Sequence, residues 1–235
     1  MKRADIEWLG DSALLLRFGE RIDAAVSASV HAVAQALRGA ALPGVRDIVP
    51  AYASITVHYD PAAWNDPRAD EPPGERLVAR LCDFVENCNI SAAGKSLPAV
   101  EIPICYGGEF GPDLAQVAVL AQLDVDTVIA RHLAAAYRIA MLGFAPGFPY
   151  LLGLDPALHT PRRAQPRTRV PAGSVAIGGA HTGIYPRALP GGWQIIGRTP
   201  LALFDAARDP PALLAPGQRV RFRAIDADAF AKLQR

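Results

Sequence analysis

Short apolar segments alternate with glycine and proline over residues 141–199, which read MLGFAPGFPYLLGLDPALHTPRRAQPRTRVPAGSVAIGGAHTGIYPRALPGGWQIIGRT. Seven prolines and seven glycines lie between Pro156 and Pro200. Glycine and proline end strands and shape turns, so short apolar runs between them are typical of a compact β-barrel with structured loops. This stretch therefore predicts a β-barrel in the second half of the chain.

The same stretch is rich in arginine and free of acid. The 49 residues between Asp155 and Asp205 contain six arginines and no carboxylate. Guanidinium groups bind carboxylates and phosphates through two parallel hydrogen bonds, and the local potential is positive. We therefore expect a surface for a small anionic substrate; its candidate residues are Arg162, Arg163, Arg167 and Arg169. The alternative is that these arginines are solvated or pair with acidic residues from elsewhere in the chain.

The segment GFAPGFPY (residues 143–150) is a candidate ligand-binding loop. Glycine allows close approach to a ligand, and proline fixes the loop before a ligand arrives. Phe148, Pro149 and Tyr150 are its candidate contact residues. The alternative is a hydrophobic loop that only plugs the barrel.

A second candidate is the segment SVAIGGAHTG (residues 174–183), which contains Ser174 and the pair Gly178-Gly179. Backbone N–H groups in such a turn can form an anion-binding nest. His181 is a weak candidate for proton transfer, with a loop hydrogen-bonding role as the alternative. Trp193 could stack on a ligand or fill the barrel core.

The first half of the chain is predicted to be mixed α/β. Residues 13–18 and 45–59 have the apolar content and alternation of strands. Asp23 can cap a helix that Leu42-Pro43-Gly44 ends, and a second helix places Leu77, Leu81, Phe84 and Cys88 on one face. The expected fold class is α+β, with a ferredoxin-like α/β domain over residues 1–90.

A second domain is expected over residues 98–235, after a small, polar linker at residues 89–97. Pro112-Asp113 can start a helix through Leu123, and Asp124 or Asp126 a second one through Tyr137. Residues 226–235 are expected to form a short final helix. Gly94-Lys95-Ser96 resembles the end of a phosphate-binding P-loop, but Asn89 occupies the place of that motif's first glycine, which argues against the motif.

Composition excludes several classes of protein. A net charge of +1 argues against a nucleic-acid binder, and no apolar run approaches the roughly 18 residues that span a bilayer. Residues 1–10 lack the apolar stretch of a signal peptide, and three cysteines without metal-ligand spacing favour a reduced, cytoplasmic compartment. The five histidines show no metal spacing either, and we expect no metal site in this chain.

Five ordered segments resemble the KipI family, whose members are called the B subunit of 5-oxoprolinase or allophanate hydrolase subunit 1. They are IPICYGGEFGPDL (102–114), YRIAMLGFAPGFPYLLGLD (137–155), TPRRAQPRTRVPAGSVAIGG (160–179), TGIYP (182–186) and GGWQIIGRTP (191–200). The resemblance implies that a cyclophilin-like β-barrel follows the α/β domain. Members often have glutamine where this chain has His181, which weakens the transfer of a role to that position.

The resemblance also implies a function and partners. The B subunit works with a KipA-like C subunit and a LamB/YcsF-like A subunit, and the complex opens 5-oxo-L-proline to glutamate with ATP hydrolysis. ATP, with Mg²⁺, would bind in a site shared with a partner, and no tightly bound cofactor is implied. The alternatives are a KipI-like inhibitor of a sensor histidine kinase and half of a urea-carboxylase-type carboxyltransferase.

Overall fold

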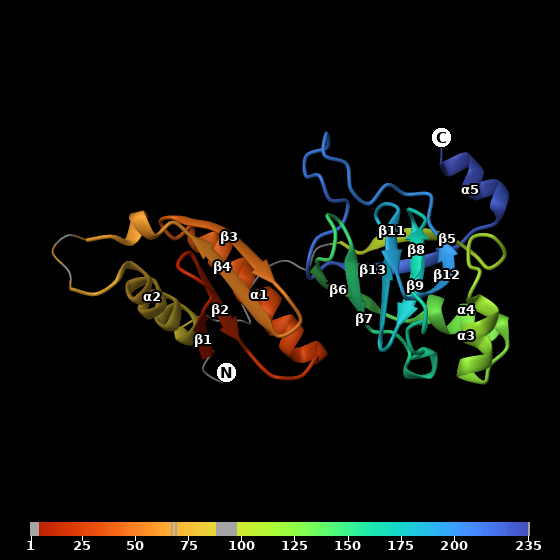
Figure 1. The fold of residues 1–235 in the computed structure, drawn as a ribbon, viewed down its shortest axis with the longest axis horizontal. Helices are drawn as coiled ribbons and strands as arrows, with labels where there is room; N and C mark the ends of the chain where they lie inside the picture. The colour runs from red at the N-terminus through yellow and green to blue at the C-terminus, as the bar shows by residue number, and fades with distance from the viewer. Residues whose placement is uncertain (1–4, 67, 69, 88–97, 235) are drawn as a thin grey trace. The chain divides into compact units, whose positions relative to one another are not determined.

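The structure is a computed structural model that describes residues 5–66, 68, 70–87 and 98–234. The chain divides into two compact units, Met1–Ser96 and Leu97–Arg235 (Figure 1). The predicted linker (89–97), the P-loop-like tripeptide within it and Cys88 lie outside the described residues.

The first unit is a four-stranded antiparallel sheet with two helices on one face. The strand order is β1-β2-β4-β3. The strands are β1 (Asp5–Trp8), β2 (Ala13–Arg17), β3 (Val45–Pro50) and β4 (Ser54–Tyr59), and the helices are α1 (Ala24–Ala40), α2 (Pro73–Asn87) and the 3-10 turn η1 (Pro61–Trp64). One apolar cluster joins Leu14 and Ile55 of the sheet to Val33 and Leu81 of the helices, so both helices cover the same face.

The helix signals in the first half are confirmed. The Asp23 carboxylate accepts hydrogen bonds from the backbone N–H groups of Ala25 and Val26 and caps α1. The helix ends before Leu42, as the Leu-Pro-Gly sequence predicts. The elements run ββαββα, whereas a ferredoxin-like fold runs βαββαβ, so the ferredoxin-like part of the prediction is not confirmed.

The second unit is a closed β-barrel with strand order β10-β7-β6-β13-β5-β12-β9. These strands are β5 (Val100–Tyr106), β6 (Tyr137–Leu142), β7 (Pro149–Leu152), β9 (Ser174–Gly178), β10 (His181–Ile184), β12 (Gln194–Arg198) and β13 (Arg219–Ala224). Only the β5–β13 pair is parallel among the described strands of the barrel. The predicted barrel is therefore confirmed, and its closure fits the cyclophilin-like expectation.

Smaller elements surround the barrel. A two-stranded sheet pairs β8 (Arg167–Val170) with β11 (Leu189–Gly191). Figure 1 shows helices α3 (Leu114–Ala121) and α4 (Val125–Ala134) in contact with each other, and α5 (Ala227–Leu233) near the C-terminus. The 3-10 turn η3 (Pro156–Leu158) contacts both α3 and α4. Apolar residues at the core of the unit include Ile104, Ile139 and Ile177.

One predicted element in the second half extends too far. The helix expected to run through Tyr137 ends at Ala134, because Ala135 is extended and Tyr137 opens β6 as a buried partner of Val220 in β13. Helical periodicity continues through residues 135–137, so barrel pairing overrides a local signal there.

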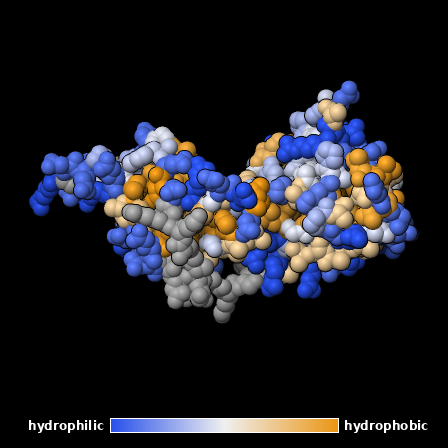
Figure 2. Space-filling model, turned by 90° about the horizontal axis from the view of Figure 1, so that it is seen from below, coloured by the Kyte–Doolittle hydropathy of each residue, from blue (hydrophilic) through white to orange (hydrophobic). Residues whose placement is uncertain are grey.

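Exposed apolar side chains are distributed over several elements. Figure 2 shows orange and blue residues interspersed on the visible face of both units. The exposed large apolar residues include Trp8 in β1, Val119 in α3 and Phe144 in the loop after β6. Isolated residues of this kind are ordinary on protein surfaces. None of the helices in the described ranges has the length and apolar character that crossing a membrane requires.

Candidate functional site

A pocket of about 220 Å³ opens on the barrel unit. Four segments line it: the β6–β7 loop with β7, the segment before β8, the end of β10, and β11 with the residues after it. The lining residues are Phe144, Phe148, Tyr150, Arg162, Arg163, Pro166, Tyr185, Pro190, Gly191, Gly192 and Trp193. Five of the residues predicted from sequence therefore meet in one cavity: Phe148, Tyr150, Arg162, Arg163 and Trp193.

Five of the eleven residues that line the pocket are aromatic. Phe148 lies at the centre of the group, with ring centroids 4.9 Å from Tyr150, 5.1 Å from Tyr185 and 5.8 Å from Trp193. Phe144 packs edge-on against it at 5.4 Å. Tilted and edge-to-face arrangements are favourable for aromatic pairs, so the rings hold one another in place and present a preformed wall.

Two glycines leave the space that Trp193 occupies. A Cβ atom on Gly178 would lie 2.6 Å from the indole ring, and one on Gly183 would lie 3.0 Å from it. Both positions are on adjacent strands of the barrel, β9 and β10. Gly178 lacks the Cβ atom that would clash with Trp193, and its predicted place in an anion nest stays a prediction. Gly179 has positive φ and donates its N–H to the Thr160 carbonyl oxygen, so that N–H is already used.

Arg162 carries a positive charge at the rim of the pocket. Its guanidinium carbon lies 5.9 Å from the centroid of the Trp193 ring, a cation–π arrangement. Among the described residues, no carboxylate forms an ion pair with it. Burial raises the pKa of Tyr150 and Tyr185, and the Arg162 charge partly opposes both shifts. The Arg162 charge therefore acts on the tyrosine hydroxyl groups of the aromatic wall.

Backbone contacts fix the segment on both sides of Arg162. The Pro161 carbonyl oxygen accepts a hydrogen bond from Gln194 Nε2 at 3.1 Å. The Arg163 N–H donates to the Gly192 carbonyl oxygen at 2.7 Å. These two hydrogen bonds hold the backbone of Arg162 in place, and its guanidinium group remains available to a ligand.

Asp113 neutralises part of the arginine cluster. Its buried carboxylate accepts two hydrogen bonds from Arg167 at 2.8 Å, one from Arg163 at 2.9 Å and one from the Ile195 N–H at 2.7 Å. For Arg163 and Arg167 the alternative interpretation from sequence is therefore the one observed: they pair with an acid from elsewhere in the chain. Four donors satisfy both carboxylate oxygens, and two arginines against one aspartate leave one positive charge.

The other predicted residues lie away from the lining of the pocket. Arg169 is exposed on β8, Ser174 is fully buried at the start of β9, and Pro149 is buried at the start of β7. His181 opens β10 opposite Gly178. Its pKa is lowered, first by burial and then by the charges of His159 and Arg162. At neutral pH its ring is therefore uncharged and can both accept and donate a hydrogen bond.

Sequence reasoning missed Tyr185, Phe144 and Asp113 as residues of the site. Tyr185 follows β10 directly within TGIYP, and Phe144 lies in the GFAPGFPY loop, so both were inside segments already singled out. Asp113 was expected only to start a helix. It stands before α3 but its side chain makes no capping hydrogen bond, because the carboxylate serves the arginines instead. No local signal in the sequence reveals that role.

A buried hydrogen-bonded chain runs through the barrel core apart from the pocket. Tyr106 Oη lies 2.8 Å from His132 Nδ1, and His132 Nε2 lies 3.2 Å from Thr182 Oγ1. Thr182 donates to the Ala176 carbonyl oxygen, so its hydroxyl oxygen accepts from His132 Nε2–H and leaves Nδ1 to accept from Tyr106. Complete burial lowers the pKa of His132 to about 3. A buried, neutral histidine of this kind has a structural role.

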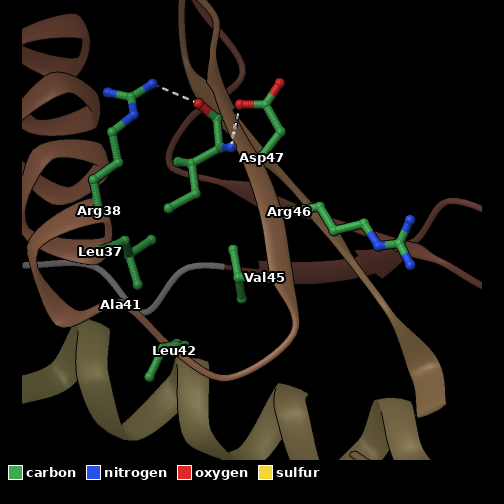
Figure 3. Close-up of a pocket in the computed structure, with 8 residues that line it drawn as sticks. Leu37, Arg38, Ala41, Leu42, Val45, Arg46 and Asp47 are labelled. Atoms are coloured by element: carbon green, nitrogen blue, oxygen red, sulfur yellow. Dashed lines mark hydrogen bonds between the residues drawn. The ribbon is translucent and has the colours of Figure 1, made fainter. Parts of the chain in front are cut away.

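The first unit has a cavity of its own, of about 240 Å³, between α1 and β3 (Figure 3). Leu37, Leu42 and Val45 supply apolar surface to it. The Arg38 guanidinium donates to the Ile48 carbonyl oxygen, and Arg46 points away and pairs with Asp60 at 2.6 Å. The charge of Arg46 is therefore paired, whereas Arg38 is held by a backbone carbonyl oxygen and has no ion pair among the described residues. Unlike the barrel pocket, this cavity has no aromatic side chain among its lining residues. Across the described ranges, no cluster of His, Cys, Asp and Glu side chains could hold a metal ion.

Known proteins resemble the chain along most of its length. Residues 4–214 match the family described as carboxyltransferase domain, subdomain C and D. A protein of Bacillus subtilis, named as the B subunit of 5-oxoprolinase, is 45% identical over 95% of this chain and 93% of its own length. The chain therefore belongs to the carboxyltransferase domain, subdomain C and D, family. The B subunit of 5-oxoprolinase from Escherichia coli O157:H7 is 43% identical over 94% of this chain and 96% of its own.

Solved structures of longer proteins contain the same fold. TTHA0988 superposes with a TM-score of 0.76 at 39% identity; the match covers 92% of this chain but only 40% of that one. The Kluyveromyces lactis urea carboxylase superposes with a TM-score of 0.69 over 97% of this chain and 22% of its own length. Its identity is 20%, so this second likeness concerns the fold alone.

Proposed function

We propose that this chain is one component of an ATP-dependent enzyme complex that opens the ring of 5-oxo-L-proline to L-glutamate, and that it is inactive alone. The names of two relatives, 45% and 43% identical over nearly their whole length, support a role in 5-oxoprolinase. Both relatives are named as subunits, which supports a complex. The cytoplasm is the proposed compartment, because ATP and reduced cysteines are found there.

The chemistry of the reaction calls for a site that collects anions. A lactam is a stabilised amide, so we propose that ATP phosphorylates its carbonyl oxygen to give a better leaving group. ADP leaves in that step. One water then adds to the phosphorylated carbon and the C–N bond breaks, with the nitrogen taking up a proton, which gives an acyl phosphate of glutamate. A second water hydrolyses the acyl phosphate to glutamate and inorganic phosphate. The substrate carboxylate, the ATP phosphates and the charge on the transferred phosphoryl group all need positive charge nearby.

One observation carries the assignment of this chain to that site. The barrel segments that resemble the family bring together an aromatic pocket and the Arg162 guanidinium, which has no ion pair within the part of the chain that the structure describes. A flat wall beside a cation suits a small cyclic carboxylate. We propose that ATP, with Mg²⁺, binds in a site shared with partner proteins, of which a KipA-like C subunit and a LamB/YcsF-like A subunit are the candidates.

Reconstitution tests this function. The chain is mixed with the purified KipA-like and LamB/YcsF-like proteins, ATP and 5-oxo-L-proline, and glutamate is measured with each protein omitted in turn. We expect glutamate only when all three proteins and ATP are present. Equal rates of glutamate formation with and without this chain would remove the proposal.

A carboxyltransferase role is the second candidate, because the matching family is described as a carboxyltransferase domain. In that case the chain would act with a biotin carboxylase and a urea-like substrate. Transfer of labelled carboxyl groups from a biotinylated carrier, in the absence of any ATP-dependent glutamate formation, would favour this function over the first.

A further inference from the structure

We propose that the barrel pocket of this chain binds the lactam substrate itself, with its carboxylate on Arg162 and its ring against the aromatic wall, and that ATP binds outside this pocket. The identity of the lactam rests on the function proposed above. The claim that the substrate binds in this pocket and the nucleotide outside it rests on the geometry of the pocket.

The size of the pocket is the first argument. Sites for drug-sized ligands and cofactors usually enclose about 300–1,000 Å³. The barrel pocket encloses about 220 Å³. A five-membered ring with one carboxylate fits that space, whereas a nucleoside triphosphate with its base, ribose and three phosphates exceeds it.

The second argument is the number of lining guanidinium groups that have no ion pair. Arg163 and Arg167 direct their guanidinium groups to Asp113, which leaves Arg162 as the lining arginine without an ion pair among the described residues. One guanidinium matches one carboxylate through two parallel hydrogen bonds. A triphosphate carries several negative charges and would leave most of them without a partner here.

The third argument concerns the ring. Phe148, Tyr150 and Trp193 offer apolar faces whose positions are fixed by mutual packing. A flat lactam ring buries its carbon atoms against such faces. Burial raises the pKa of the Tyr185 hydroxyl, so it stays protonated and can donate a hydrogen bond to a lactam carbonyl oxygen.

The positioning of Arg162 completes the argument. The Gln194–Pro161 and Arg163–Gly192 hydrogen bonds hold its backbone, and the ion pair of Arg163 with Asp113 ties the same segment to the start of α3. A guanidinium held on a rigid segment loses less conformational freedom on binding. The pocket is therefore built for one carboxylate at one place.

Calorimetric titration of the full chain, alone and in the assembled complex, tests the inference. The ligands are 5-oxo-L-proline, 2-pyrrolidinone, which lacks the carboxylate, and a non-hydrolysable ATP analogue. We expect 5-oxo-L-proline to bind and the ATP analogue not to compete with it. Because 2-pyrrolidinone cannot make the charge-assisted hydrogen bonds of the carboxylate, it should bind at least about tenfold more weakly.

Two matched variants locate the contact. Arg162→Gln should weaken binding of 5-oxo-L-proline by about tenfold or more for the same reason. Arg187→Gln removes an exposed arginine of the same barrel that does not line the pocket, and it should leave binding unchanged. Binding of 2-pyrrolidinone should be unaffected by either variant, which separates loss of the carboxylate contact from damage to the pocket.

Several outcomes would overturn the inference. They are competition by the ATP analogue, equal losses in Arg162→Gln and Arg187→Gln, and absence of 5-oxo-L-proline binding from both the chain and the complex. In the last case the proposed function survives if the complex still needs this chain to form glutamate. If the chain binds the lactam but is dispensable for glutamate formation, the proposed function fails instead.

Discussion

Two neighbouring arginines of the barrel unit, Arg162 and Arg163, differ in whether a carboxylate pairs with them. Arg163 is bound to the buried Asp113, whereas Arg162 lies over the Trp193 ring without an ion pair among the described residues. A guanidinium bound to a buried carboxylate is held in place by that partner, whereas one without an ion pair beside a pocket is available to a ligand. The arginine content of the segment was readable from sequence. The sequence does not show which arginine is available to a ligand, because Asp113 lies fifty residues away from Arg163 in the chain.

Replacing Asp113 with asparagine should destabilise the barrel unit. The carboxylate accepts four hydrogen bonds, and breaking a buried ion pair costs about 3 kcal/mol or more. We expect a clear fall in the urea midpoint of unfolding. Asp126→Asn, at an exposed position in the first turn of α4, is the control and should change the free energy of unfolding by less than about 1 kcal/mol. Similar midpoints for the two variants would contradict this account of Asp113.

His132 should make the stability of the protein depend on pH. Its pKa is lowered to about 3 by burial, so it stays neutral in the folded state, while in the unfolded chain it binds a proton below about pH 6.5. Protons therefore favour unfolding, and stability falls as the pH decreases. Linkage gives a loss of about 2 kcal/mol between pH 7 and pH 5 from this one group.

Urea unfolding of the wild type and of His132→Gln over that pH range measures the effect. The variant is expected to be less stable at pH 7, because it loses the contacts to Tyr106 and Thr182. Its free energy of unfolding should nevertheless change less between pH 7 and pH 5. Parallel pH profiles for the two proteins would argue against a neutral, buried His132.

Among the elements, the loop between β6 and β7 shows how one segment can serve both fold and site. Phe148 is buried and central to the aromatic wall, whereas Phe144 is 62% exposed with a φ of 66°. A positive φ is strained for a residue with a side chain, and such strain is often found at ligand sites. The loop therefore keeps Phe144 at the mouth of the pocket at some cost to its own stability.

Two substitutions in this loop should have very different effects on stability. Phe144→Gly removes about 1 kcal/mol or more of backbone strain and loses an edge-on ring contact of similar size, so its free energy of unfolding should change by about 1 kcal/mol or less. Phe148→Ala leaves a cavity in the wall and should cost about 3–5 kcal/mol. Thermal unfolding of both variants compares them; equal destabilisation would contradict the assigned roles.

Elements were predictable from sequence where they carry their own signals. Asp23, Asp124 and Asp226 accept backbone hydrogen bonds at the starts of α1, α4 and α5, as the sequence predicts. The short strands β7, β8 and β11 have too few residues to show a period, so only their pairing defines them. Glycine marks a close approach at Gly178, and the group that approaches it in the structure is the Trp193 ring.

On the scale of the whole molecule, closure of the barrel assembles a site that no single segment contains. The Asp113 carboxylate accepts a hydrogen bond from the N–H of Ile195, a residue 82 positions later in the sequence. The residues that line the pocket come from four separate segments. Sequence indicated the barrel and five of the eleven residues that line the pocket. It could not show the pairing, because contacts of this range depend on strand order, which local patterns do not encode.

The assembled complex should reveal which part of a shared site this chain supplies. We propose that the barrel pocket holds the lactam and that ATP binds elsewhere in the complex. A change at Arg162 should therefore affect the two substrates differently. A contact made with only one substrate changes the KM of that substrate and not of the other.

The most direct measurement is steady-state glutamate formation by the complex assembled with wild-type chain, Arg162→Gln or Arg187→Gln. We predict that Arg162→Gln raises the KM for 5-oxo-L-proline by about tenfold or more, as expected for loss of a charge-assisted hydrogen bond, while the KM for ATP stays unchanged. Arg187→Gln should behave as the wild type does. An unaltered KM for 5-oxo-L-proline in Arg162→Gln would contradict the claim that this pocket binds the substrate.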